Sequence, residues 1–155
     1  MTLWIDADAC PKIVKEFLFK AAVRLNMRTV LVANSGMFLP RSPLFRMQVV
    51  GREIDAADHY IRDNSAPDDL VITADIPLAA SLVDKQVTVI DPRGTVYTPG
   101  NVKEALATRN LMQDLRESGL QQGGPPPLGS NDKVRFANAF DREVTRLKRQ
   151  GTSAP

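Results

Sequence analysis

Five aspartates in the first half of the chain have the types and spacing that suit a cation site. Asp6 and Asp8 follow the apolar run LWI at the start of the chain, and Asp75 follows the run LVIT. Asp55 and Asp58 lie between them, in the stretch EIDAADHYIRDN. Carboxylate oxygens suit hard ions such as Mg²⁺ and Mn²⁺, and such ions promote phosphodiester hydrolysis. No histidines and cysteines cluster in the sequence, which argues against a zinc site.

Apolar runs and amphipathic stretches alternate along the chain and predict an α/β fold. We expect strands over 3–5, 29–33, 47–50, 70–73 and 87–90, and helices over 13–25, 53–64, 102–117 and 132–150, with a further helix opening at Pro77. The β-branched runs lack polar alternation, as is typical of strands covered on both faces. The sequence therefore predicts a mainly parallel sheet with helices on its faces.

The predicted sheet would bring the distant aspartates together. Parallel strands joined by short α/β connections present their carboxyl ends at one edge of a sheet, which is where ligands bind. Asp6, Asp8 and Asp75 follow such strands, and Asp55 and Asp58 share one face of the predicted helix 53–64. We therefore expect all five to form a catalytic acidic cluster, with Asp6, Asp58 and Asp75 as the metal ligands.

Several basic and polar residues are candidates for substrate binding. Phosphate contacts supply most of the sequence-independent affinity for nucleic acid, so cations that flank an acidic metal site would admit a phosphate backbone. We assign this role to Lys12, Arg93 and Arg109. Asn34 and Ser35 follow a predicted strand and face the same edge in this interpretation, although ordinary turn chemistry explains them equally well.

Each candidate also has an ordinary structural explanation. Asp8 or Asp75 would cap a helix by accepting hydrogen bonds from free backbone N–H groups. Asp55 and Asp58, taken singly, resemble solvated helix residues. Cys10 has no evident base partner, and packing as a small residue explains it better than nucleophilic catalysis.

The composition indicates an ordinary globular protein. The chain has 155 residues, of which 43% are hydrophobic and 25% charged, with a net charge of +2. We expect one domain over 1–150, which includes a turn-rich linker over 121–130 and a C-terminal helix that docks on the domain. A disordered tail over 151–155 should follow it. The apolar runs are too short to span a membrane, and the N-terminus lacks the pattern of a secretory signal. A single cysteine agrees with a reducing compartment, so we expect a cytoplasmic protein.

Several motifs of the chain resemble the bacterial YaiI/YqxD family. They are IDADACP at 5–11, DAAD at 55–58, VITADIPLA at 71–79, Arg93-Gly94, and the Gly123-Gly124-Pro125 linker. The resemblance covers nearly the whole chain, to about Leu147. It implies a PIN-like domain, which has a three-layer α/β/α architecture around a mainly parallel sheet.

Many PIN-like domains are metal-dependent ribonucleases that carry aspartates after the first strand, on a middle helix and after a later strand. Asp6, the Asp55/Asp58 pair and Asp75 match this order. Asp8 is an additional carboxylate, and Asp91 is the remaining candidate for a fourth acidic position. The resemblance thus implies a nuclease that uses Mg²⁺ or Mn²⁺ and takes RNA as its partner, without indicating an oligomeric state.

Two alternatives stay open at this point. The first is a phosphohydrolase of the haloacid-dehalogenase type, in which Asp6 and Asp8 would be the nucleophile and the acid, and Ser35 a second strand-end group. The second is a non-catalytic RNA- or protein-binding module with a PIN-like shape. The first alternative leaves Asp55 and Asp58 without a role.

Overall fold

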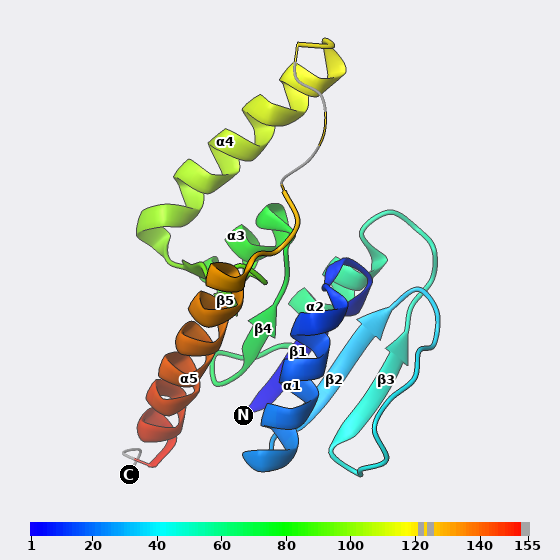
Figure 1. Ribbon diagram of the computed structural model, residues 1–155, viewed down its shortest axis with the longest axis vertical. Coiled ribbons are helices and arrows are strands. Elements are labelled where there is room, and N and C mark those ends of the chain that lie inside the picture. The colour runs from blue at the N-terminus through cyan, green and yellow to red at the C-terminus, as the bar shows by residue number, and fades with distance from the viewer. Residues whose placement is uncertain (121–122, 124–125, 153–155) are drawn as a thin grey trace.

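A computed structural model describes residues 1–120, 123 and 126–152, and its centre is a six-stranded sheet of order β3-β2-β1-β4-β5-β6 (Figure 1). The strands are β1 (Thr2–Asp6), β2 (Arg28–Ala33), β3 (Phe45–Val49), β4 (Leu70–Ile72), β5 (Thr88–Ile90) and β6 (Val96–Tyr97). Neighbouring strands are parallel except for β5 and β6. The predicted mainly parallel sheet is confirmed. The sequence analysis missed β6 because two residues are too few to show a pattern.

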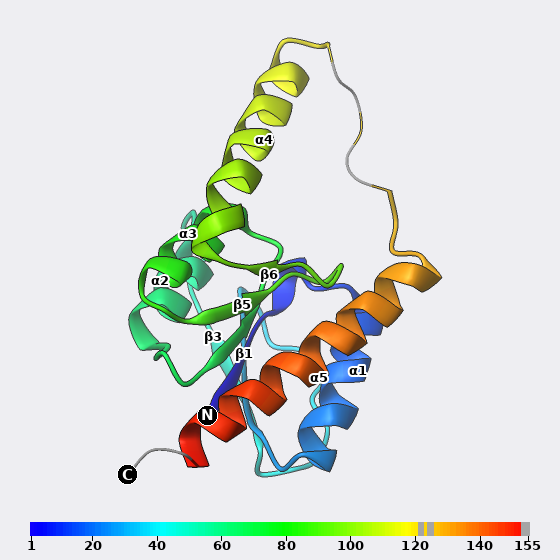
Figure 2. The ribbon, with the colours of Figure 1, turned by 90° about the vertical axis from the view of Figure 1, so that its left-hand side faces the viewer.

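The helices form a layer on each side of this sheet. The helical elements are the 3₁₀ turn η1 (Ala7–Ala9) and helices α1 (Lys12–Arg24), α2 (Ala56–Asn64), α3 (Ile76–Asp84), α4 (Pro99–Glu117) and α5 (Ser130–Thr152). Figure 2 shows α1 and α5 on one side of the sheet and α2 and α3 on the other. The fold is therefore a three-layer α/β/α architecture, as expected.

Alternating side chains of the strands supply two hydrophobic cores. In β1, Leu3 and Ile5 pack with the core beneath α1 and α5, whereas Trp4 belongs to the core beneath α2 and α3. Phe17 of α1 makes edge-to-face contacts with Phe136 and Phe140 of α5, with ring centroids 5.7 and 5.6 Å apart. These aromatic contacts hold the C-terminal helix against α1.

The four helices predicted with both bounds differ from the structure by one to three residues at one or both ends. The helix expected over 53–64 begins at Ala56, because Asp55 has a left-handed backbone with φ of +63° and ends the regular turn there. The last helix extends through Gly151 and Thr152, which we assigned to the tail. The rest of that tail, 153–155, lies outside the described residues, as do linker residues 121–122 and 124–125.

Helix α4 projects from the body of the molecule (Figures 1 and 2). Its base packs on α3 and β6, and Val102 is its buried residue. Leu111 and Met112 are 57% and 37% exposed, because the second half of the helix has left the sheet. None of the helices in the described part of the chain combines the length and the apolarity needed to cross a bilayer.

Gly94 allows the β5–β6 turn to lie directly against α5, and its replacement tests that contact. Its φ is +95°, and a Cβ there would lie 2.7 Å from the backbone of Arg135 and Phe136. Gly94→Ala should therefore lower the free energy of unfolding by more than the roughly 1–2 kcal/mol that left-handed strain alone costs, as measured by urea denaturation. Gly119→Ala is the control, because Gly119 has φ of +79° with nothing within 4 Å of a Cβ. Equal losses in the two variants would contradict the close approach.

Candidate functional site

The carboxyl ends of β1 and β4 form the centre of the candidate site. These strands are neighbours, yet the chain leaves β1 toward β2 and β3 before it returns to β4, so the strand order reverses between them. Ligands bind at such switch points in open α/β sheets. Because Ile5 pairs with Ile72, Asp6 comes to lie next to Thr73 at this edge.

Thr73 connects the two strand-end aspartates. Its hydroxyl donates a hydrogen bond of 2.8 Å to Oδ2 of Asp6 and accepts one of 3.0 Å from the backbone N–H of Asp75. Both Asp6 and Thr73 are buried, so these bonds are shielded from water. The sequence analysis did not single out Thr73. The available signal was a hydroxyl at the end of the otherwise apolar run LVIT.

Asp75 caps helix α3, as its ordinary structural explanation proposed. Its Oδ1 accepts a 2.9 Å hydrogen bond from the backbone N–H of Leu78, and Pro77 occupies the first turn, where its missing N–H costs nothing. A carboxylate has a second oxygen, so capping leaves Asp75 able to bind a cation as well.

Asp55 and Asp58 reach the same place from the start of α2. Asp55 is the N-cap residue of this helix but makes no side-chain capping bond, and Asp58 lies in the first turn. One carboxylate oxygen from each of Asp55, Asp58 and Asp75 lies within 4.8 Å of the other two. These three residues, called here the aspartate cluster, are the group in the described part of the chain that could hold a metal ion. Our predicted ligand set has Asp6 in place of Asp55.

Two carboxyl groups of the site, those of Asp58 and Asp6, have a raised pKa. Burial, a hydrogen bond with Asp75, and the charges of Asp75, Asp6 and Asp55 raise the pKa of Asp58 from 3.8 to about 8. Burial also raises the pKa of Asp6, together with the charges of Asp75 and Asp8, while the Thr73 hydrogen bond opposes this shift. Asp6 is therefore close enough to influence the aspartate cluster. A divalent cation would relieve the same repulsion that the proton relieves.

The donor groups of the cluster match a hard cation. All three ligands are carboxylate oxygens, which suit Mg²⁺ and Mn²⁺ better than zinc. Cys10 is buried, and burial raises the pKa of its thiol to about 12, so it remains a neutral packing residue near pH 7. His59 is exposed and does not belong to the cluster.

Asp8 and the two residues after β2 lie beside the site rather than in the cluster. Asp8 accepts a 2.8 Å hydrogen bond from the backbone N–H of Asn34, which ties the η1 turn to the end of β2. Asp8, Asn34 and Ser35 are all exposed. Asp8 thus contributes negative charge near Asp6 and holds the η1 turn against the end of β2. Asn34 contributes its backbone N–H to this contact.

Asp91 does not supply a fourth carboxylate to the cluster. Its Oδ1 accepts hydrogen bonds of 2.9 and 3.0 Å from the backbone N–H groups of Arg93 and Thr95, and the Tyr97 hydroxyl donates to its other oxygen at 3.4 Å. These bonds shape the β5–β6 turn. The carboxylate of Asp91 is therefore engaged in its own loop.

Two of the predicted substrate-binding cations, Lys12 and Arg93, line the same strand-end cavity, whereas Arg109 lines a hollow along α4. Arg93 forms a 3.0 Å ion pair with Asp132 and also donates to the carbonyl of Pro126, so it fastens the β5–β6 turn to the start of α5. Lys12 is exposed and lines a cavity of about 630 Å³ at the strand ends. Arg109 is exposed on α4.

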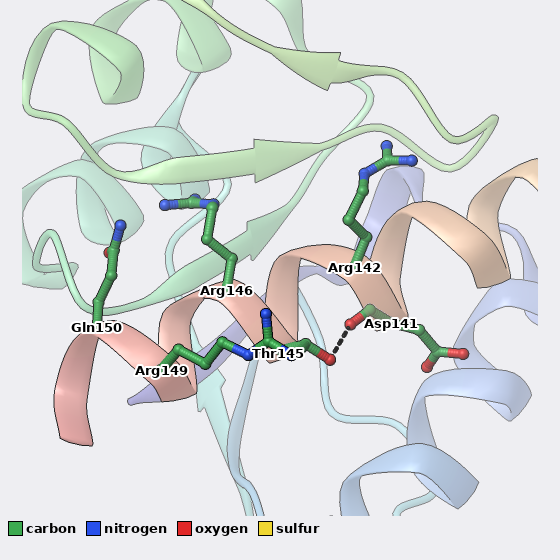
Figure 3. Close-up of a pocket in the computed structure, with 6 residues that line it drawn as sticks. All are labelled: Asp141, Arg142, Thr145, Arg146, Arg149 and Gln150. Atoms are coloured by element: carbon green, nitrogen blue, oxygen red, sulfur yellow. Dashed lines mark hydrogen bonds between the residues drawn. The ribbon is translucent and has the colours of Figure 1, made fainter. Parts of the chain in front are cut away.

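A separate basic hollow of about 560 Å³ lies along α5 (Figure 3). Arg146 donates a 2.8 Å hydrogen bond to Thr88 and pairs with the buried Glu143 at 3.0 Å. Thr88 opens β5, so this hollow is at the amino-terminal edge of the sheet, opposite the aspartate cluster. The arginines that line this hollow, Arg142, Arg146 and Arg149, do not belong to the candidate site.

Comparison with known proteins assigns the chain to a family. Residues 4–146 match the family model described as uncharacterised BCR, YaiI/YqxD family. A UPF0178 protein of Geobacter metallireducens is 51% identical over 150 residues, covering 97% of each chain. A UPF0178 protein of Legionella pneumophila is 48% identical over 148 residues, covering 96% of this chain and all of that protein. No solved structure matches the chain. The chain therefore belongs to the YaiI/YqxD family.

Proposed function

We propose that this protein is a nuclease that hydrolyses phosphodiester bonds of RNA and depends on Mg²⁺ or Mn²⁺. The observation that carries the proposal is the convergence of Asp55, Asp58 and Asp75, from two separate elements, within 4.8 Å at the switch point of the sheet. When bound, such an ion polarises the phosphate and makes a water molecule more acidic. The order of the aspartates, which matches PIN-like nucleases, supports the assignment.

The side chains around the cluster would have distinct roles. Asp55, Asp58 and Asp75 would hold the ion, while Asp6 and Asp8 would add negative charge that strengthens its binding. The exposed ammonium of Lys12 and guanidinium of Arg109 would attract the phosphate backbone. Thr73 would act as a positioning residue, because it fixes Asp6 relative to Asp75.

The phosphohydrolase alternative suits the structure less well. It requires Asp6 to attack a phosphate, but Asp6 is only 6% exposed, and Oδ2 of its carboxylate accepts the Thr73 hydrogen bond. It also gives no role to Asp55 and Asp58, whose carboxylates the fold brings together with Asp75. A non-catalytic binding module would retain RNA affinity without metal-dependent turnover, so activity assays separate it from the nuclease.

Replacement of Asp75 tests the chemistry with little risk to the fold. Asparagine caps helices about as well as aspartate, so Asp75→Asn should keep α3 while it removes a charged ligand. We expect Mn²⁺-dependent cleavage of RNA to fall by at least about 100-fold, more than the loss typical of residues that only support a ligand. The control is Asp63→Asn, because Asp63 is exposed on the same α2 helix as Asp58 but lies outside the cluster. Undiminished turnover in Asp75→Asn would refute the nuclease.

The pH dependence of stability provides a test that needs no substrate. Folded, metal-free protein keeps a proton on Asp58 up to about pH 8, whereas an unfolded chain releases it near 3.8. The folded state therefore binds more protons in this interval, and its stability should fall as the pH rises through it. The Asp58→Asn variant should lack the loss of stability that Asp58 causes as the pH rises. In the wild type, added Mn²⁺ should make that loss smaller. Urea denaturation with EDTA or with Mn²⁺ measures both effects. Identical profiles of stability against pH for the wild type and Asp58→Asn would contradict the proton kept on Asp58.

The hydroxyl of Thr73 should affect metal binding and not only folding. Thr73→Val removes the donor to Asp6 and the acceptor for the Asp75 N–H, and we expect roughly tenfold weaker Mn²⁺ binding by calorimetry. Thr73→Ser keeps the hydroxyl and should restore the affinity. A purely structural role would lower the urea midpoint of Thr73→Val and leave its Mn²⁺ affinity unchanged.

A further inference from the structure

A groove along α4 reaches the residues that flank Asp75. It has a volume of about 650 Å³, and its lining includes Ala74, Ile76, Thr108, Arg109, Met112 and Arg116. The strand-end cavity of about 630 Å³, which Lys12 lines, shares Ala74 and Ile76 with it. The two hollows therefore meet at the chain neighbours of Asp75. Together they are called here the α4 trough, which adjoins the aspartate cluster at these two residues.

The α4 wall of this trough has the chemistry of a phosphate-binding surface. Arg109 and Arg116 are seven residues apart, so they lie on one face of α4 about 10 Å apart along its axis. Both are exposed, and Glu104 is the one carboxylate among the residues that line this part of the trough. Guanidinium groups bind phosphate oxygens through paired hydrogen bonds. Two of them at this spacing would contact phosphates of different nucleotides.

The size and the remaining lining favour a single strand over a duplex. Each hollow has the volume of a small-ligand pocket, a size that suits the individual nucleotides of a strand. Ile76 and Met112 offer apolar surface, and Thr108 adds a hydroxyl-bearing side chain to the same lining. Unpaired bases expose their faces and edges to such side chains, whereas a duplex hides them.

We propose that the α4 trough binds a single strand of nucleic acid, with Arg109 and Arg116 holding phosphates on one side of the cleaved bond and Lys12 holding one on the other side. This proposal rests on the proposed nuclease function, because a strand bound in the trough would lie next to Ala74 and Ile76, the chain neighbours of Asp75. It also gives a role to the projecting half of α4, which makes its main packing contacts through its base on α3 and β6.

The test compares two variants that lose the same charge. Binding of a short fluorescein-labelled single-stranded RNA is followed by anisotropy at several salt concentrations. Arg109→Ala/Arg116→Ala should weaken binding by about tenfold and reduce the slope of log affinity against log salt by about 1.4, since each single-strand phosphate contact contributes about 0.7. Arg24→Ala/Lys103→Ala removes two exposed cations that do not line the trough and should change neither quantity appreciably. The same RNA as a duplex should bind more weakly to the wild type.

Several outcomes would overturn the proposal. Equal losses in the two double variants would show only a general attraction of charge, and stronger binding of the duplex would contradict the single strand. Sedimentation of each protein identifies a third outcome: if the trough variant changes its association state but not its RNA affinity, this face joins two copies of the chain. Hydrolysis of bis(p-nitrophenyl) phosphate by the wild type with Mn²⁺ tests the nuclease separately, so its absence would refute the proposed function and leave the binding comparison valid.

Discussion

Parallel pairing of β1 with β4 is the constraint on which the candidate site depends. The register of these two strands puts Asp6 beside Thr73, and the Thr73 hydroxyl then fixes the position of Asp75 through its backbone N–H. Strand β1 is buried on both faces, because Leu3 and Trp4 belong to cores on opposite sides of the sheet, and β4 is buried likewise through Leu70 and Val71. A shift in register would move apolar side chains of β1 to the wrong core. The packing of the protein therefore also determines the geometry of its carboxylates.

The protonation of Asp58 follows from the same arrangement of carboxylates. Burial, the hydrogen bond with Asp75 and the repulsion between converging carboxylates together raise the pKa of Asp58. A proton and a divalent cation are alternative ways to offset that repulsion. The candidate site is consequently most attractive to a cation under conditions in which the proton has left, and hydrogen bonds from Thr73 and Leu78 keep two of the carboxyl groups in place in either state.

The sequence predicts the ends of strands better than it predicts the backbone between them. Unbroken apolar runs identified β1, β2, β4 and β5, and two of these runs led directly to Asp6 and Asp75. Asp55 was placed on a helix, whereas its left-handed backbone puts it before α2 and turns its carboxylate toward Asp58 and Asp75. Such a conformation of a single residue leaves no periodic signal. The capping role of Asp75 was foreseeable from Pro77, but the bridge made by Thr73 required knowledge of which strands pair.

The two outer strands of the sheet bear on how the protein behaves at high concentration. Unpaired edge strands can act as templates for a strand of another chain. On one side the sheet closes with β6, an antiparallel strand of only two residues. On the other side, β3 carries Arg46 and Gln48, which are both hydrogen-bonded to the Tyr60 hydroxyl of α2. The short edge strand β6 and the polar edge strand β3 each disfavour pairing with a strand of another chain. The edges of this sheet therefore resist aggregation.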